Sequence, residues 1–168
     1  MTSIAKSRSQ KKRTPQDAVQ LLTADHAEVS ALFKKYDKIA DAHAPASDRQ
    51  AHAEQICTLL TVHATIEEEI FYPAARAAGV EDSLMDEADV EHAAAKDLIA
   101  QIRAMTPDED LYDAKVKVLG EQIDHHVEEE EGETFPAAKK SDMDLAELGA
   151  RMLARKNQLM SELGESAA

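Results

Sequence analysis

Apolar residues recur at alternating steps of three and four positions over four long stretches of the chain. This spacing places apolar side chains along one side of a helix, as in helices that pack into a bundle. The four stripes are Val19, Leu22, Val29, Phe33, Tyr36 and Ala40; Ile56, Leu59, Ile66 and Ile70; Met85, Ala88, Ala95, Ile99 and Ile102; and Tyr112, Val116, Leu119 and Ile123. The pattern predicts an all-α protein, an up-down-up-down four-helix bundle with helices of about 25–30 residues.

Turn and capping residues separate these stripes. Breaks are predicted at residues 44–46, at Gly79 and at residues 106–108, and Thr14 and Ser47 are predicted to cap the first two helices. The predicted organisation is a disordered basic tail over residues 1–13, the bundle over 14–140, and a C-terminal amphipathic helix with a short tail over 141–168.

The C-terminal stretch predicts a fifth, shorter helix. Its apolar residues are Leu145, Leu148, Met152 and Leu159, and it contains no histidine. Such a helix can pack on the bundle, cover one end of it, or join two chains. We therefore expect either a monomer or a homodimer formed through this helix.

Each of the four stripes contains one histidine where an apolar residue is expected. These residues are His26, His63, His92 and His126. The midpoints between successive histidines fall at or within about two residues of the predicted turns. In a bundle with short loops, residues equidistant from a turn lie at the same height. The four histidines are therefore predicted to form one inward-facing layer.

Two glutamates are predicted to join this layer. Glu67 and Glu130 each follow a histidine by four positions, so each lies one helical turn from His63 or His126 on the same face. A single histidine on an apolar face is more often a hydrogen-bonded core residue. Burying six such groups without partners would cost about 1–3 kcal/mol or more for each. Metal binding supplies the partner, and imidazole with carboxylate suits a transition-metal pair.

The composition excludes several other functions. The net charge is −14, of which the first thirteen residues contribute +5, so the remainder carries −19 and is expected to repel nucleic acid and anionic membranes. There is no apolar run long enough to span a bilayer, and the single cysteine, Cys57, excludes an intrachain disulfide and suits the cytoplasm. The sequence also has no glycine-rich phosphate loop and no HExxH motif, and no Glu-x-x-His motif ends at a stripe histidine.

An ordered set of motifs over roughly residues 15–140 resembles the hemerythrin-like HHE cation-binding family. The motifs are Asp25-His26, His63-x-x-x-Glu67 ending in Phe71-Tyr72-Pro73, Glu91-His92, and His126-x-x-x-Glu130 ending in Phe135-Pro136. The resemblance implies a four-helix bundle that holds two iron ions joined by an oxo or hydroxo bridge, with zinc or manganese as possible substitutes. It assigns His26 and His63 to one iron, His92 and His126 to the other, and Glu67 and Glu130 as bridging carboxylates.

One position departs from the oxygen-carrying hemerythrins, which have a second histidine one turn after the third-helix ligand. Here that residue is Lys96, which has no lone pair to donate when charged. The centre would then be poorer in histidine and more symmetric, with open or water-filled positions, which argues against reversible oxygen carriage. Glu68 and Glu129 are the nearest additional carboxylates, and His125 the nearest additional imidazole. All three are predicted to face away from the centre as solvated groups.

Three functions are compatible with such a centre. The favoured one is a binding protein that senses, stores or carries oxygen, nitric oxide or iron. The second is a di-iron enzyme that decomposes peroxide or nitrogen oxides, for which Tyr36 or Tyr112 would be the nearest phenol. The third is a structural bundle with a single zinc. The expected partner is a small diatomic ligand or peroxide, with no nucleic acid and no membrane.

Overall fold

A computed structural model describes residues 15–166 of the chain, and within this range every regular element is helical. The elements are α1 (Ala18–Asp41), α2 (Ala46–Ile66), the π-turn η1 (Glu67–Phe71), α3 (Tyr72–Ala77), α4 (Asp82–Ala104), α5 (Tyr112–Glu129), the π-turn η2 (Glu130–Thr134), α6 (Phe135–Lys140) and α7 (Leu145–Ser166). The predicted all-α class is confirmed.

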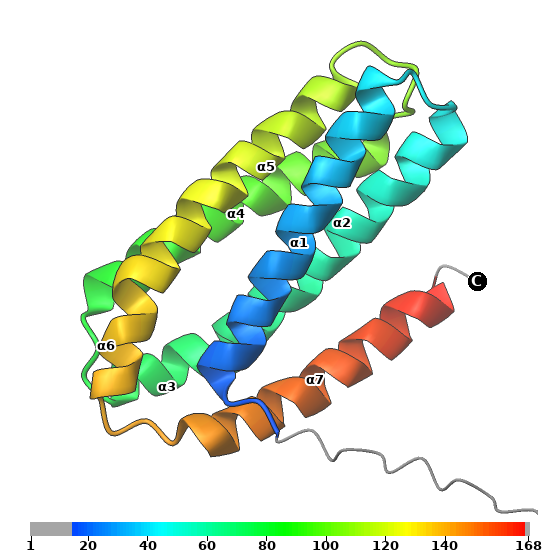
Figure 1. Cartoon of the computed structure of the whole chain (residues 1–168). Coiled ribbons are helices and arrows are strands. Elements are labelled where there is room, and N and C mark those ends of the chain that lie inside the picture. The colour runs from blue at the N-terminus through cyan, green and yellow to red at the C-terminus, as the bar shows by residue number, and fades with distance from the viewer. Residues whose placement is uncertain (1–14, 167–168) are drawn as a thin grey trace, which may run out of the picture.

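Helices α1, α2, α4 and α5 form the four-helix bundle and run side by side (Figure 1). Helix α1 packs against α2 and α5, and α4 packs against α5 and α2. Successive long helices are therefore neighbours with alternating direction, as short connections require. This is the predicted up-down-up-down arrangement.

The helix starts differ from those predicted. Helix α1 begins after Asp17, whose side chain accepts a hydrogen bond from the backbone of Gln20, while the Gln20 side chain accepts one from the backbone of Asp17. The predicted cap Thr14 lies outside the described residues. Helix α2 begins after Pro45 without a side-chain cap, so Ser47 lies inside the first turn. Asp17 and Gln20 therefore form a capping box at the N-terminus of α1.

A π-turn begins at each of the two buried glutamates, Glu67 and Glu130. In η1 the backbone N–H of Tyr72 donates to the carbonyl of Glu67, and in η2 that of Phe135 donates to the carbonyl of Glu130, five residues earlier in each case. The residue after each donor is a proline, Pro73 or Pro136, which has no N–H and crowds the carbonyl four positions before it. Widening the turn relieves this crowding, and such turns occur frequently at functional sites.

The core is divided into two apolar clusters. One cluster is at the end of the bundle nearest α3, α6 and α7 and includes Leu22, Phe71, Met85, Phe135 and Met152. The other is towards the α1–α2 and α4–α5 connections and includes Tyr36, Ile56, Ile99, Val116 and Leu119. Between them, the four histidines and two glutamates of the predicted layer are all buried.

Helix α7 packs on α1, α2 and η1, below the bundle in Figure 1. Of the three roles expected for it, packing on the bundle is the one observed. With 22 residues it is shorter than the four bundle segments, as predicted. Helix α2 continues without a break through η1 and α3 to Ala77, α5 continues through η2 and α6 to Lys140, and α1 and α4 have 24 and 23 residues. A role in a homodimer and the domain limits at residues 14 and 140 stay predictions, and the basic tail over 1–13 lies outside the described residues. No helix within 15–166 has the length and hydropathy needed to cross a membrane.

Gly149 permits the close approach of α7 to the start of α1. A Cβ atom at this position would lie 2.5 Å from the backbone oxygen of Gln16 and 2.7 Å from the carbonyl carbon of Asp17. Backbone atoms cannot move aside as a flexible side chain can. The glycine is therefore required by packing, although it weakens the helix intrinsically.

We expect Gly149→Ala to lower the free energy of unfolding by about 1–3 kcal/mol, because α7 must move away from α1. Gly164→Ala on the same helix is the matched control, since a Cβ there meets nothing within 4 Å. The control should be neutral or stabilising by up to about 1 kcal/mol. Chemical denaturation of both variants checks this, and equal effects would contradict the packing role of Gly149.

Candidate metal centre

The four histidines converge as two pairs. The Nε2 atoms of His26 and His63 lie 3.2 Å apart, and those of His92 and His126 also lie 3.2 Å apart. Each pair combines helices adjacent in the bundle, α1 with α2 and α4 with α5. All four side chains are at least nine-tenths buried, so their ring nitrogens face one another rather than solvent.

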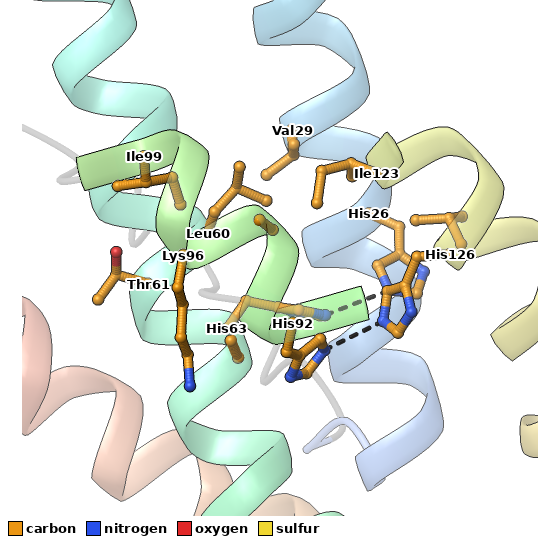
Figure 2. A pocket seen from close by; sticks show the side chains of 13 residues that line it. His26, Val29, Leu60, Thr61, His63, His92, Lys96, Ile99, Ile123 and His126 are labelled. Carbon is orange, nitrogen blue, oxygen red and sulfur yellow. Dashed lines mark hydrogen bonds between the residues drawn. The ribbon is translucent and has the colours of Figure 1, made fainter. Parts of the chain in front are cut away.

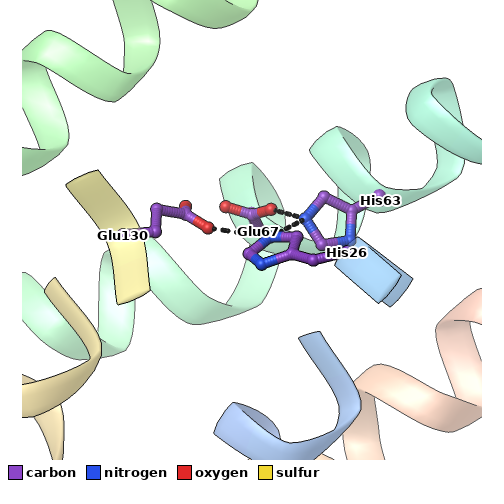
Figure 3. A group of neighbouring side chains, drawn as sticks. All are labelled: His26, His63, Glu67 and Glu130. Carbon is purple, nitrogen blue, oxygen red and sulfur yellow. Dashed lines mark hydrogen bonds and ion pairs between the residues drawn. The ribbon is translucent and has the colours of Figure 1, made fainter. Parts of the chain in front are cut away.

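The two glutamates lie between the pairs, and each directs one oxygen towards each pair. Oε2 of Glu130 lies 3.2 Å from Nε2 of His26, and its Oε1 lies 3.3 Å from Nε2 of His126. Oε1 of Glu67 contacts Nε2 of His63, and its Oε2 lies 3.9 Å from Nε2 of His92. Figure 3 shows both glutamates beside the first histidine pair.

These six residues make two overlapping groups of four possible metal ligands. One group is His26, His63, Glu67 and Glu130, and the other is His92, His126, Glu67 and Glu130, with ligand atoms within 4.8 Å of one another in each. Both glutamates belong to both groups. The structure thus brings together all six residues predicted from the sequence, and the pairing matches the one the resemblance implies. Their roles as metal ligands stay a prediction.

Four further carboxylates surround this layer, and sequence reasoning missed their role. Each accepts a hydrogen bond from the outer nitrogen, Nδ1, of one histidine. The pairs are His26 with Glu131, His63 with Asp25, His92 with Glu68 and His126 with Glu91, at 3.0–3.1 Å. A signal was present, because each of these carboxylates is adjacent in sequence to a buried histidine or glutamate and serves a histidine on another element.

The outer carboxylates orient the histidines for metal binding. A hydrogen bond from Nδ1 fixes the proton on that nitrogen and leaves a lone pair on Nε2, the nitrogen that points inward. Within the described chain, both oxygens of Glu67 and Oε2 of Glu130 are buried without a hydrogen-bond donor. Lone pairs and carboxylate charges therefore face each other, and this arrangement requires a cation between them. The residues fit a pair of metal ions.

The same carboxylates raise the pKa values of two of the histidines, His63 and His126. Burial opposes charging of His63, but the facing Glu67 and the hydrogen bond to Asp25 outweigh it and raise the pKa of His63 to about 10. Burial likewise opposes charging of His126, yet Glu130 raises its pKa to about 10. In the absence of metal, protons on these imidazoles supply the positive charge that the carboxylates require.

Tyr72 makes the two halves of the centre different. Its hydroxyl donates to Oε1 of Glu130 and lies 3.4 Å from Nε2 of His92. Burial, together with the charges of Glu67 and Glu130, raises its pKa strongly, so the phenol stays protonated. The corresponding residue of the second motif is Phe135, which stacks on His26 with ring centroids 5.7 Å apart.

Tyr72 replaces the phenols expected from the sequence. Tyr36 donates instead to Asp113 at 2.6 Å and belongs, with Tyr112, to the apolar cluster at the far side of the bundle. Neither lines the histidine layer. Sequence reasoning quoted Tyr72 within a motif but assigned it no role, because a helical wheel without the π-turn does not place it at the centre.

Two lysines form ion pairs with outer carboxylates and so compensate their negative charge. Nζ of Lys96 lies 2.6 and 2.7 Å from the two oxygens of Glu68, and Nζ of Lys156 on α7 lies 2.5 Å from Oδ1 of Asp25. Glu68 is therefore not the solvated charge that was predicted, since it connects Lys96 to His92. Glu129 belongs to neither buried ligand group, and its partly exposed carboxylate lies 3.1 Å from Nε2 of the exposed His125.

A small apolar pocket lies against the histidine layer. Figure 2 shows all four histidines on one side and Val29, Leu60, Ile99 and Ile123 on the other. Its volume is about 30 Å³, and Lys96, whose side chain is half exposed, is among its lining residues. A cavity of this size holds a molecule of a few atoms.

Comparison with known proteins identifies the class. The family model described as the hemerythrin HHE cation binding domain matches residues 17–138. The chain therefore belongs to the hemerythrin HHE cation-binding family, and its buried cluster of histidines and glutamates is compatible with the metal binding that this family name describes.

Two individual proteins are similar to this chain. The crystal structure of a hemerythrin HHE cation binding domain-containing protein from Mycobacterium kansasii superposes with a TM-score of 0.71, at 26% identity, over 88% of this chain and 89% of that one. A protein of Nostoc sp. described as a DNA nickase is 29% identical over 154 residues, which are 90% of this chain and 42% of that protein. The chain thus spans less than half the length of the Nostoc protein.

We expect Glu67→Ala and Glu130→Ala each to reduce metal content from about two ions per chain to one or none, because each substitution removes a ligand shared by both groups. The melting temperature should fall as well, since the histidines lose their partner. Glu128→Ala, an exposed residue of α5, is the control. Elemental analysis and thermal unfolding check this, and retention of two ions in either variant would disprove the bridging role.

Metal binding at pH 7 should release about two protons per chain, because the raised pKa values of His63 and His126 leave both imidazoles protonated in the metal-free protein. Affinity should accordingly rise with pH up to about 10. Calorimetric titration in two buffers of different ionisation enthalpy measures the released protons. A binding heat independent of the buffer would contradict this expectation.

Proposed function

We propose that the chain is a non-haem di-iron protein that binds or senses a small neutral molecule, oxygen or nitric oxide. The observation that carries the proposal is the juxtaposition of the two ligand groups, which share Glu67 and Glu130, with the apolar pocket of about 30 Å³. The shared glutamates favour two ions over one. The pocket favours a ligand of a few atoms over an organic substrate.

The ligand set supports iron but admits zinc or manganese. Four imidazoles and two carboxylates form a mixed nitrogen and oxygen donor set that suits first-row transition metals. A bound iron pair supplies redox chemistry and open coordination positions for a small ligand. The chain's own residues orient the imidazoles, exclude bulk water and limit the size of what reaches the centre.

An enzyme that decomposes peroxide or nitrogen oxides is the second candidate, and Tyr72 is the observation that favours it. This buried phenol retains its proton and donates a hydrogen bond to Glu130, so a hydrogen-bond donor lies directly beside the predicted ligands. The similar Nostoc protein is described as a DNA nickase, but the net charge of −14 opposes binding of this chain to DNA.

Elemental analysis of the purified protein tests the metal assignment. We expect about two iron ions per chain, one for each ligand group. About one zinc and no iron would support the structural-zinc alternative and end the di-iron proposal. Peroxide added to iron-loaded protein then separates the two remaining candidates. Rapid turnover that Tyr72→Phe slows supports the enzyme, whereas slow iron loss or bleaching supports the binding protein.

Filling the pocket should separate ligand binding from metal binding. Ala95 is buried in the pocket wall, so Ala95→Leu should leave the iron content unchanged and weaken nitric oxide binding by about tenfold or more. Ala93→Leu, on the exposed face of the same helix, is the matched control. The visible spectrum of the reduced protein titrated with nitric oxide reports binding. Unchanged binding in Ala95→Leu would exclude this pocket as the ligand site.

A further inference from the structure

The buried layer is approached from two sides of opposite chemistry. One is the apolar pocket, where Lys96 is the charged residue in the lining. The other is a groove of about 20 Å³ between α4 and α5, lined by Glu87, Glu91, Glu129 and Glu133 and reaching His126 and Glu130. The described residues that line this groove include no lysine or arginine. The apolar pocket offers a metal cation no negative charge in its lining, whereas the carboxylates of the groove attract one.

A third His-x-x-x-Glu pair lies at the outer side of this groove. Nε2 of His125 is 3.1 Å from Oε1 of Glu129, four residues later on α5, and 3.8 Å from Oε2 of Glu91 on α4. One ligand atom from each of the three residues lies within 4.8 Å of the others. His125 is 65% exposed, Glu129 31% and Glu91 20%, so the cluster is accessible from solvent.

Glu91 connects this outer cluster to the buried centre. Its Oε2 faces His125, while its Oε1 accepts a hydrogen bond from Nδ1 of His126 at 3.0 Å. Further along the groove lies Glu130, only 2% exposed, whose Oε2 has no hydrogen-bond donor among the described residues. A cation at the outer cluster would therefore be separated from His126 only by the carboxylate of Glu91. The buried carboxylate of Glu130 lies next to His126.

We propose that Glu91, His125 and Glu129 form an outer divalent-cation site that loads the buried centre through the groove. The inference rests on metal binding at the buried centre. One imidazole and two carboxylates suit Fe²⁺, Mn²⁺ or Zn²⁺, and solvent completes the coordination. Three ligands that are accessible from solvent bind the ion weakly enough to release it, whereas the buried groups surround it on all sides. The groove carboxylates increase the local concentration of cations.

The test is the rate at which metal-free protein takes up Co²⁺, followed by its visible absorption in a stopped-flow instrument. His125→Ala and Glu129→Gln should slow uptake by about tenfold and leave the final metal content and melting temperature unchanged. Glu91 is left intact, because it also positions His126. Glu128→Gln is the matched control, since it makes the same charge change at the adjacent exposed residue, which does not line the groove.

Four results would overturn the proposal. Uptake by His125→Ala at the wild-type rate would show that His125 and Glu129 are only an exposed ion pair. Equal slowing by Glu128→Gln would show that net charge alone matters. Reduced final metal content would place these residues in the centre itself. Wild-type protein that takes up no metal would overturn the buried-centre assignment as well, whereas normal filling at an unchanged rate overturns the loading site alone.

Discussion

The burial of six ionisable side chains in one layer is the constraint on which the structure depends. Unpaired imidazoles and carboxylates between two apolar clusters would cost more free energy than a domain of this size can spare. The chain meets this constraint in two directions. Outward, each histidine donates to a carboxylate from another helix; inward, the lone pairs and carboxylate oxygens converge on positions for positive charge. The polar layer is thus compatible with the apolar clusters on either side of it only because its groups have partners.

The two halves of this layer have the same order of structural elements but differ at individual residues. Each half contributes a histidine, a glutamate four residues later, a π-turn and a proline. The halves differ where Tyr72 in one corresponds to Phe135 in the other, so that a phenol faces one histidine pair and a phenyl ring stacks on the other. They also differ in their lysines, because Lys96 reaches Glu68 and Lys156 reaches Asp25. A near-symmetric framework therefore holds two chemically distinct positions.

The helices and the histidine layer were predictable because both follow from local spacing. Steps of three and four set the buried face, and the turn positions set the height of His26, His63, His92 and His126. The outer carboxylates were not predictable in this way, since each serves a histidine on another helix and its role depends on the angle between helices. Tyr72 was missed because the π-turn before it rotates the following residues away from the ideal helical wheel.

The contact between Lys156 and Asp25 has a consequence for the C-terminal helix. Asp25 holds His63 with one oxygen and Lys156 of α7 with the other, although 131 residues separate Asp25 from this lysine in sequence. Anything that fixes His63 therefore also fixes the carboxylate on which α7 docks. A metal ion bound through His63 would therefore stabilise the docked state of α7, and by thermodynamic reciprocity docking of α7 would strengthen metal binding by the same free energy. Occupancy of the buried centre would in this way be communicated to a surface helix whose residues belong to neither ligand group.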